Sequence, residues 1–148
     1  MLVQQILRAK ARGTDRDPVV TVTPETVVAE VAALLSAKRI GAVIVSPDGK
    51  RPVGIVSERD IVRDVGRRGA EALALTAADI MTRKLVTCGT DDVADQVLSH
   101  MTDGRFRHMP VLEDGIMVGV ISIGDVVKAR LDELNMEKEA LKGMIMGY

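Results

Sequence analysis

The sequence predicts an α/β fold made of two βαββα repeats, related by a pseudo-twofold axis and flanked by N- and C-terminal helices. Two patterns that each occur twice carry this prediction. Val-Thr followed by an apolar residue stands at residues 20–22 and again, as Val-Thr-Cys, at residues 86–88. Gly-hydrophobic-hydrophobic-Ser-x-x-Asp spans residues 54–60 and again residues 119–125. Both patterns recur after about 65 residues, and a fixed spacing of this kind is the signature of an internal structural repeat.

The first half of repeat one is predicted to contain a strand, a helix and a buried strand. Residues 19–22 are Val and Thr, which favour strands. Thr23 suits a helix N-cap and Pro24 suits the first helical position. Apolar residues at 27, 28, 31, 34 and 35 then fall on one helix face. Residues 40–45 are almost entirely apolar, which predicts a strand buried on both sides.

The second half of repeat one follows a turn and ends in a helix. Pro-Asp-Gly at residues 47–49 is a turn signal, and residues 53–56 form the next predicted strand. Ser57 is predicted to cap a helix that ends at Gly66 or Gly69.

Repeat two shows the same order of elements. Thr90 is predicted to cap a helix with apolar residues at 93, 97, 98 and 101, and Gly104 is predicted to close it. Residues 106–112 and 118–121 are predicted to pair as strands around an Asp-Gly turn, and Ser122 is predicted to cap the helix that follows.

Three segments lie outside the repeats. Val3, Ile6 and Leu7 indicate a short amphipathic helix before Gly13. The linker carries a second helical stretch near residues 70–75. The last helix runs past the repeat, with an apolar stripe at residues 127, 131, 134, 141 and 145 that Lys138 interrupts. The predicted segments are an N-terminal helix and lead-in over 1–17, the first repeat over 18–66, a linker over 67–82, the second repeat over 83–130 and a C-terminal helix extension over 131–148.

Composition excludes several classes of function. The net charge is −1, and Phe106 and Tyr148 are the only aromatic residues, so neither a basic patch nor a stacking platform supports nucleic-acid binding. Cys88 is the single cysteine, which fits a reducing compartment. No apolar run has the length of a membrane span. The cytoplasm is therefore predicted, with a mitochondrial-type presequence containing Arg8, Lys10 and Arg12 as the alternative.

The Ser-x-x-Asp pairs can be interpreted in two ways. Ser57 with Asp60, and Ser122 with Asp125, have the spacing of a capping box, so helix capping alone is one interpretation. The other is a nucleotide site. A helix N-terminus and a Ser hydroxyl suit a phosphate, whereas the two acceptor oxygens of an Asp suit a ribose diol. The spacing alone leaves both open.

The doubled Gly-hydrophobic-hydrophobic-Ser-x-x-Asp pattern, within the doubled βαββα order, resembles the tandem CBS (cystathionine beta-synthase-like) domain family over about residues 18–130. Ile-Met-Thr at residues 80–82 and Arg-His-Met-Pro-Val at residues 107–111 also look like this family. The resemblance implies that each Asp holds ribose, that each Ser faces phosphate and that the first strand of each repeat lines the adenine pocket. It also implies two clefts between the repeats.

The two repeats differ where the second strand begins. Repeat two has Arg107, which can bind a phosphate. Met109 and Pro110 follow, and they can form an apolar surface against an adenine. Repeat one has Gly-Ala-Val-Ile at residues 41–44, so Arg59 is the candidate for the missing charge. The tighter site is therefore predicted in repeat two. The candidate ligand-binding residues are Thr21, Val22, Ala42, Val43, Ser57, Arg59 and Asp60 in repeat one, and Thr87, Cys88, Arg107, His108, Met109, Pro110, Ser122 and Asp125 in repeat two.

The predicted function is a stand-alone, non-catalytic module that binds an adenosine nucleotide and regulates a partner protein whose identity the sequence does not give. The adenosine prediction rests on the resemblance, with AMP favoured over ADP, ATP, NAD or S-adenosylmethionine. The sequence contains no metal-ligand cluster, P-loop or catalytic triad order, so neither an enzyme nor a metal protein is predicted. A purely structural dimerisation module is the alternative. A homodimer is predicted, because the last helix leaves an apolar stripe to be covered; the N-terminal helix is the other candidate to cover it.

Overall fold

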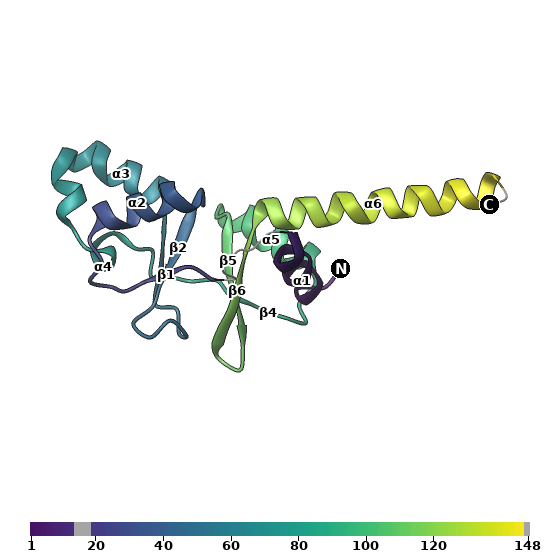
Figure 1. The fold of residues 1–148 in the computed structure, drawn as a ribbon, viewed down its shortest axis with the longest axis horizontal. Helices are drawn as coiled ribbons and strands as arrows, with labels where there is room; N and C mark the ends of the chain where they lie inside the picture. Colours follow the sequence, from purple (N-terminus) through teal and green to yellow (C-terminus); the bar gives the residue numbers. More distant parts are fainter. Residues whose placement is uncertain (14–18, 147–148) are drawn as a thin grey trace. The chain divides into compact units, whose positions relative to one another are not determined.

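The computed structural model describes residues 1–13 and 19–146 (Figure 1). The described helices are α1 (Val3–Gly13), α2 (Val28–Lys38), α3 (Glu58–Arg68), α4 (Ala77–Ile80), α5 (Ala94–Gly104), α6 (Ile123–Met146) and the 3-10 helix η1 (Gly69–Ala74). The described strands are β1 (Thr21–Val22), β2 (Ala42–Val45), β3 (Gly54–Ser57), β4 (Cys88–Gly89), β5 (His108–Glu113) and β6 (Ile116–Ser122). The predicted boundary at residues 17 and 18, and the end of the chain at residues 147 and 148, lie outside the described residues.

The βαββα order occurs twice, as predicted, and each copy forms a three-stranded sheet. The first sheet has the order β1-β2-β3 and the second the order β4-β5-β6. In the first sheet β1 runs parallel to β2, and β2 runs antiparallel to β3. The parallel pair requires a crossover connection, which α2 supplies. The pseudo-twofold relation of the repeats and the clefts between them stay predictions.

The core of repeat one lies between its sheet and its helices. Val43, Val45 and Val56 point to the same side of the sheet because side chains alternate along a strand. They pack against α2 and α4. The buried members of this cluster are Val22, Val28, Val31, Leu35, Val43, Val45, Val56, Ala77 and Ile80. The predicted apolar face of the helix is thus confirmed for Val28, Val31 and Leu35, whereas Val27 is exposed.

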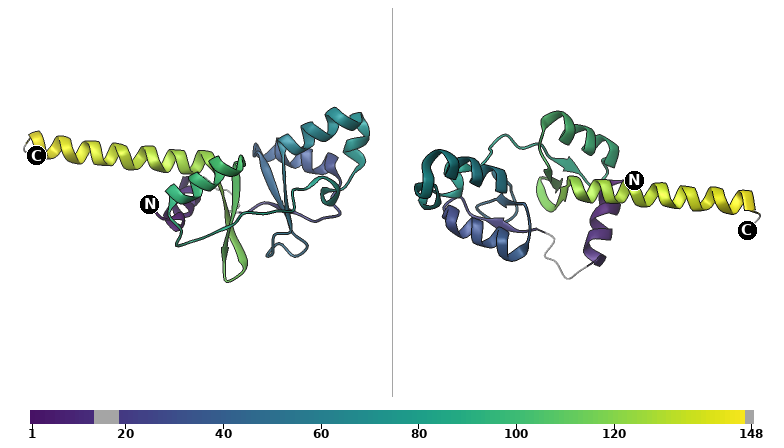
Figure 2. Two further views of the ribbon diagram at one scale, coloured as in Figure 1. Left: turned by 180° about the vertical axis from the view of Figure 1, so that it is seen from behind. Right: turned by 90° about the horizontal axis from the view of Figure 1, so that it is seen from above.

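The chain divides into two compact units. Among the described residues, one unit contains α1, residues 88–109 and residues 121–146; the other contains residues 19–87 and 110–120. In the first unit the start of α1 is held by backbone hydrogen bonds. The Val3 amide donates to the Asp92 carbonyl (2.9 Å), and the Ala94 amide donates to the Met1 carbonyl (2.9 Å). Both views of Figure 2 show α1 beside the first half of α6, and Val3 and Ile6 are buried.

The predicted starts of two helices are wrong. Thr23 and Pro24 precede α2 by a full turn, and Val27 occupies the N-cap position instead. Thr23 is held in a turn, where its amide donates to the hydroxyl of Thr26 (3.1 Å). Thr90 likewise precedes α5, whose N-cap is Val93. In both places a hydroxyl or carboxylate side chain closes a local turn before the helix begins.

The other helix ends and turns are close to the predictions. Of the two predicted glycines, Gly69 ends α3, with a φ of 66°. The stretch near residues 70–75 is the 3-10 helix η1. Gly104 is the last residue of α5, and Arg105 takes the left-handed conformation after it (φ 56°). Helix α4 was not expected from the sequence; Thr76 and Asp79 begin it with a capping box. Within the described residues, no helix combines the length and hydropathy needed to cross a bilayer.

Candidate functional site

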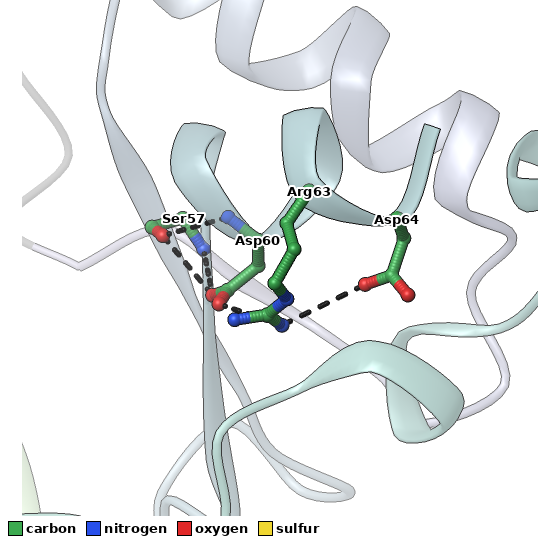
Figure 3. A network of polar contacts seen from close by, with 4 residues as sticks. All are labelled: Ser57, Asp60, Arg63 and Asp64. Atoms are coloured by element: carbon green, nitrogen blue, oxygen red, sulfur yellow. Dashed lines mark hydrogen bonds and ion pairs between the residues drawn. The ribbon is translucent and has the colours of Figure 1, made fainter. Parts of the chain in front are cut away.

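The junction between β3 and α3 is built by a reciprocal pair of hydrogen bonds. Ser57 is the last residue of β3 and the N-cap of α3. The Asp60 amide donates to the Ser57 hydroxyl (3.3 Å), and the Ser57 amide donates to Asp60 Oδ2 (2.8 Å). The Ser57 hydroxyl lies 3.0 Å from the same Oδ2 (Figure 3). Ser57 therefore caps α3 as predicted, and ligand binding by this pair stays a prediction.

Both oxygens of Asp60 are engaged inside repeat one. Oδ2 accepts from Ser57, and Oδ1 lies 3.3 Å from Nη2 of Arg63, one turn along α3 (Figure 3). The Arg63 guanidinium also lies 3.6 Å from Asp64. Arg63, which is not among the predicted site residues, therefore neutralises a carboxylate whose side chain is only 8% exposed. An i,i+3 spacing of opposite charges on a predicted helix is the signal that could have found it.

The second junction repeats the capping geometry with a different cation. Ser122 ends β6, and its amide donates to Asp125 Oδ2 (2.9 Å), while the Asp125 amide donates to the Ser122 hydroxyl (3.1 Å). The Lys10 ammonium of α1 donates to the same Oδ2 (2.9 Å). The Asp125 side chain is 23% exposed, which makes it more accessible than that of Asp60.

The pKa of Asp125 reflects opposing influences. Burial alone would raise the pKa of this carboxyl group. The hydrogen bond from the Ser122 amide and the nearby Lys10 ammonium outweigh burial and hold the pKa below its ordinary value. Asp125 is therefore an anion at neutral pH, suited to accept hydrogen bonds from hydroxyl groups.

Each junction is tied to the start of the neighbouring strand. The Glu58 amide donates to the Gly41 carbonyl (2.9 Å), and the Ile123 amide donates to the Arg107 carbonyl (2.8 Å). In repeat one the register also places Ala42 opposite Ser57. These bonds bring Ala42 to the first junction, and Arg107 and His108 to the second. The Arg107 side chain is exposed and His108 is half-buried.

Several predicted site residues serve the core. Val22 and Val43 belong to the buried cluster of repeat one, so their side chains are turned away from solvent. Met109 and Pro110 are buried as well. Thr21 is half-buried and pairs with Ile44, two residues along β2 from Ala42. Arg59 and Thr87 are exposed. That these residues line an adenine pocket or bind a phosphate stays a prediction.

Cys88 is a buried thiol. It is 7% exposed, and burial, with a smaller influence of Asp92, raises its pKa to about 11. The thiol is therefore protonated at neutral pH, which disfavours nucleophilic chemistry. Within residues 1–13 and 19–146, no three His, Cys, Asp or Glu side chains are grouped as they would be around a metal ion.

Lys10 is the neighbour of the site that sequence reasoning missed. It lies 115 residues from Asp125 along the chain. Neither a motif nor a helical spacing connects the two positions, so only the docking of α1 brings them together.

The comparisons with known proteins agree with this arrangement. The family model described as CBS domain matches the chain twice, over residues 14–67 and 77–132. The mitochondrial CBS domain-containing protein CBSX3 of Arabidopsis thaliana is 32% identical over 149 residues, which cover 98% of this chain and 72% of that protein.

Solved structures show the same fold. The CBS-domain containing protein ATU1752 from Agrobacterium tumefaciens has 45% identity and a TM-score of 0.80, over 88% of this chain and 99% of that chain. The CBS domain protein PAE2072 from Pyrobaculum aerophilum, solved in complex with AMP, has 30% identity and a TM-score of 0.72, over 84% of this chain and 89% of that chain. With both repeats matched by one family model, the chain belongs to the CBS domain family and carries two CBS domains in tandem.

Proposed function

We propose that the chain is a non-catalytic regulatory module that binds an adenosine nucleotide at the junction of β6 and α6. The observation that supports this proposal most is the set of contacts that Asp125 makes, together with the exposure of its side chain. Its contacts with Ser122 and Lys10 both fall on Oδ2, and its side chain is 23% exposed. Asp60, by contrast, uses both oxygens within its own repeat and is 8% exposed.

The surroundings of Asp125 support an anionic ligand that carries a sugar. Ser122 and the first turn of α6 offer a hydroxyl group and helix amides to a phosphate. The exposed Arg107 stands beside them, because its carbonyl binds the Ile123 amide. The relative from Pyrobaculum aerophilum was solved with AMP, which supports AMP as the first ligand to test.

The test is calorimetric titration of the full chain with AMP, ADP, ATP, NAD and S-adenosylmethionine. We expect Asp125→Ala to weaken binding of the best ligand by about 1–3 kcal/mol, because the ribose hydroxyls lose their acceptor. We expect Asp60→Ala to weaken binding less, since Asp60 is occupied by Arg63. Equal losses for the two variants would contradict this ranking.

A thermal-shift experiment provides an independent measurement. A ligand present at about 100 times its dissociation constant should stabilise the folded chain by about 2.7 kcal/mol. The absence of any shift with all five ligands would reject nucleotide binding.

The exposed face of α6 favours a second candidate, a structural homodimerisation module without a physiological nucleotide. Leu131, Leu134, Leu141 and Ile145, which we call the α6 stripe, are 46–82% exposed. A homodimer is compatible with either function, and the ligand titration separates the two. We propose the cytoplasm as the compartment; import into mitochondria is the alternative suggested by the named location of the Arabidopsis relative.

A further inference from the structure

The Lys10–Asp125 ion pair connects the N-terminal helix to the proposed nucleotide site. The Lys10 ammonium lies 2.9 Å from Asp125 Oδ2, and the two side chains are 34% and 23% exposed. The position of Lys10 is fixed by the docking of α1. The Val3 and Gln4 amides donate to the carbonyls of Asp92 and Thr90 at 2.9 and 3.0 Å. The helix thus runs from the turn before α5 to the first turn of α6.

The two repeats differ in how their aspartates are neutralised. Asp60 is paired by Arg63 of its own helix, whereas Asp125 is paired by a lysine from a separate element. The equivalent of Arg63 in repeat two is Lys128, an exposed residue. The charge that faces Asp125 is therefore carried by α1.

A ribose bound to Asp125 would compete with this ammonium. The two hydroxyls of a ribose diol donate to the two oxygens of a carboxylate, so one of them competes with Lys10 at Oδ2. An unphosphorylated nucleoside weakens the ion pair and brings no anionic group of its own for the Lys10 ammonium. A nucleotide brings a phosphate, which can pair with the displaced ammonium through charge-assisted hydrogen bonds.

Lys10 lies beside the start of α6, the end of the helix that attracts a phosphate. Asp125 Oδ2 accepts from both Lys10 and the Ser122 amide, so the ammonium lies beside the residue that precedes α6. The N-terminus of this 24-residue helix attracts phosphate to the same place.

We propose that Lys10 is a specificity-determining residue that makes the second-repeat site select phosphorylated over unphosphorylated adenosine. This inference rests on the proposed function, because it assumes that ribose binds at Asp125. It adds to that function a residue from outside both repeats, and it makes the N-terminal helix part of the binding site.

The test compares AMP with adenosine by calorimetric titration of the full chain. In the natural sequence we expect AMP to bind about tenfold or more tightly than adenosine. In Lys10→Met the ratio of the two affinities should fall by about tenfold, with AMP binding more weakly and adenosine binding as well or better. Lys10→Arg should keep the preference for AMP, because it restores the cation.

Arg8→Met is the matched control. Arg8 is an exposed cation on the same helix, so its removal changes the net charge equally without touching Asp125. We expect its AMP-to-adenosine ratio to stay within about twofold of the natural value. A ratio that falls equally in both variants would overturn the proposal in favour of a general charge effect.

Two other results separate failure of the inference from failure of the proposed function. If Asp125→Asn weakens both ligands but Lys10→Met leaves their ratio unchanged, the site stands and the role of Lys10 is overturned. If the natural chain binds neither AMP nor adenosine, the proposed ligand class is overturned and the role of Lys10 with it.

Discussion

Asp60 and Asp125 both cap a helix, but the cation that contacts the carboxylate differs between the two repeats. In each repeat Oδ2 accepts from the backbone amide of the preceding Ser, which fixes the start of a helix. The contacts of the other oxygen differ, since Oδ1 of Asp60 is paired with Arg63. Capping therefore uses Oδ2 in both repeats, whereas the neighbouring cations, Arg63 and Lys10, contact different carboxylate oxygens.

Gly54 is a residue where the repeat motif has a packing role. A Cβ atom added here would collide with the side chain of Met81, which packs beside the cluster of repeat one. We predict that Gly54→Ala destabilises the fold by about 1–3 kcal/mol, because the crowded core must shift. Urea denaturation of the purified variant measures this change.

Gly66→Ala is the matched control for this prediction. Gly66 lies inside α3 with open space around the position of an added Cβ. Alanine favours a helix interior over glycine, so we expect a stabilisation of up to about 1 kcal/mol. A neutral effect of Gly54→Ala would show that Met81 moves aside freely.

At the residue scale the sequence predicted the local contacts and missed the distant one. The hydrogen bonds of Ser57 with Asp60, and of Ser122 with Asp125, follow from a three-residue spacing. The Lys10–Asp125 pair depends on how α1 docks, and the separation of 115 residues leaves no local pattern to detect. The burial of Val43 follows from the apolar run over residues 40–45, whereas the short strand pattern around Val22 does not say which of its faces meets the core.

At the scale of elements, the wrong predictions are helix starts, where side chains compete with the helix for backbone hydrogen bonds. The order of strands and helices followed from apolar periodicity, and that periodicity extends over many residues. Thr23 was assigned as a cap on residue type alone, but it bonds to Thr26 and delays α2 to Val28. Helix α4 has only 4 residues, too few for a periodic signal.

The docking of α1 is expected to depend on pH. The pKa of Asp125 is lowered in the folded chain, where the Ser122 amide and the Lys10 ammonium outweigh burial. A lowered pKa gives stability that is fully present above the unfolded value of about 3.9 and is lost as pH falls through the folded value. We predict that Lys10→Met lowers stability by about 0.5–1 kcal/mol at pH 6.

The difference in stability between the natural chain and Lys10→Met should vanish at low pH. Once Asp125 is protonated in both proteins, well below about pH 3.9, the ammonium of Lys10 has no anion to stabilise. Calorimetric unfolding at a series of pH values would measure the convergence of the two proteins. A difference that persists unchanged to the lowest pH would show that Lys10 acts through packing of its aliphatic stem.

At the scale of the whole molecule, α6 continues well past the second repeat. Figure 1 shows its C-terminal half extending beyond α1 and α5. Helix α1 contacts the first half of α6 but leaves the α6 stripe exposed, so the N-terminal helix does not cover it. The stripe residues and Lys138 alternate at spacings of three and four, the pattern by which two helices pair along a seam.

We predict a homodimer whose interface includes the α6 stripe. Apolar side chains that are 56% (Leu131), 59% (Leu141) and 82% (Ile145) exposed would form a large patch on a monomer, and closed twofold dimers are the commonest oligomers. Leu141→Glu should raise the dimer dissociation constant about tenfold or more, because it places a charge in the seam. Met136→Glu is the matched control, since Met136 is 72% exposed but lies off the stripe. Light scattering across a concentration series measures the dimer dissociation constants of both variants.

Lys138 should mark the weakest layer of the seam, because its charge lies among apolar residues, so Lys138→Leu is expected to tighten the dimer. A monomeric natural chain at micromolar concentration would refute the dimer, and equal effects of the two glutamate variants would refute only the role of the stripe.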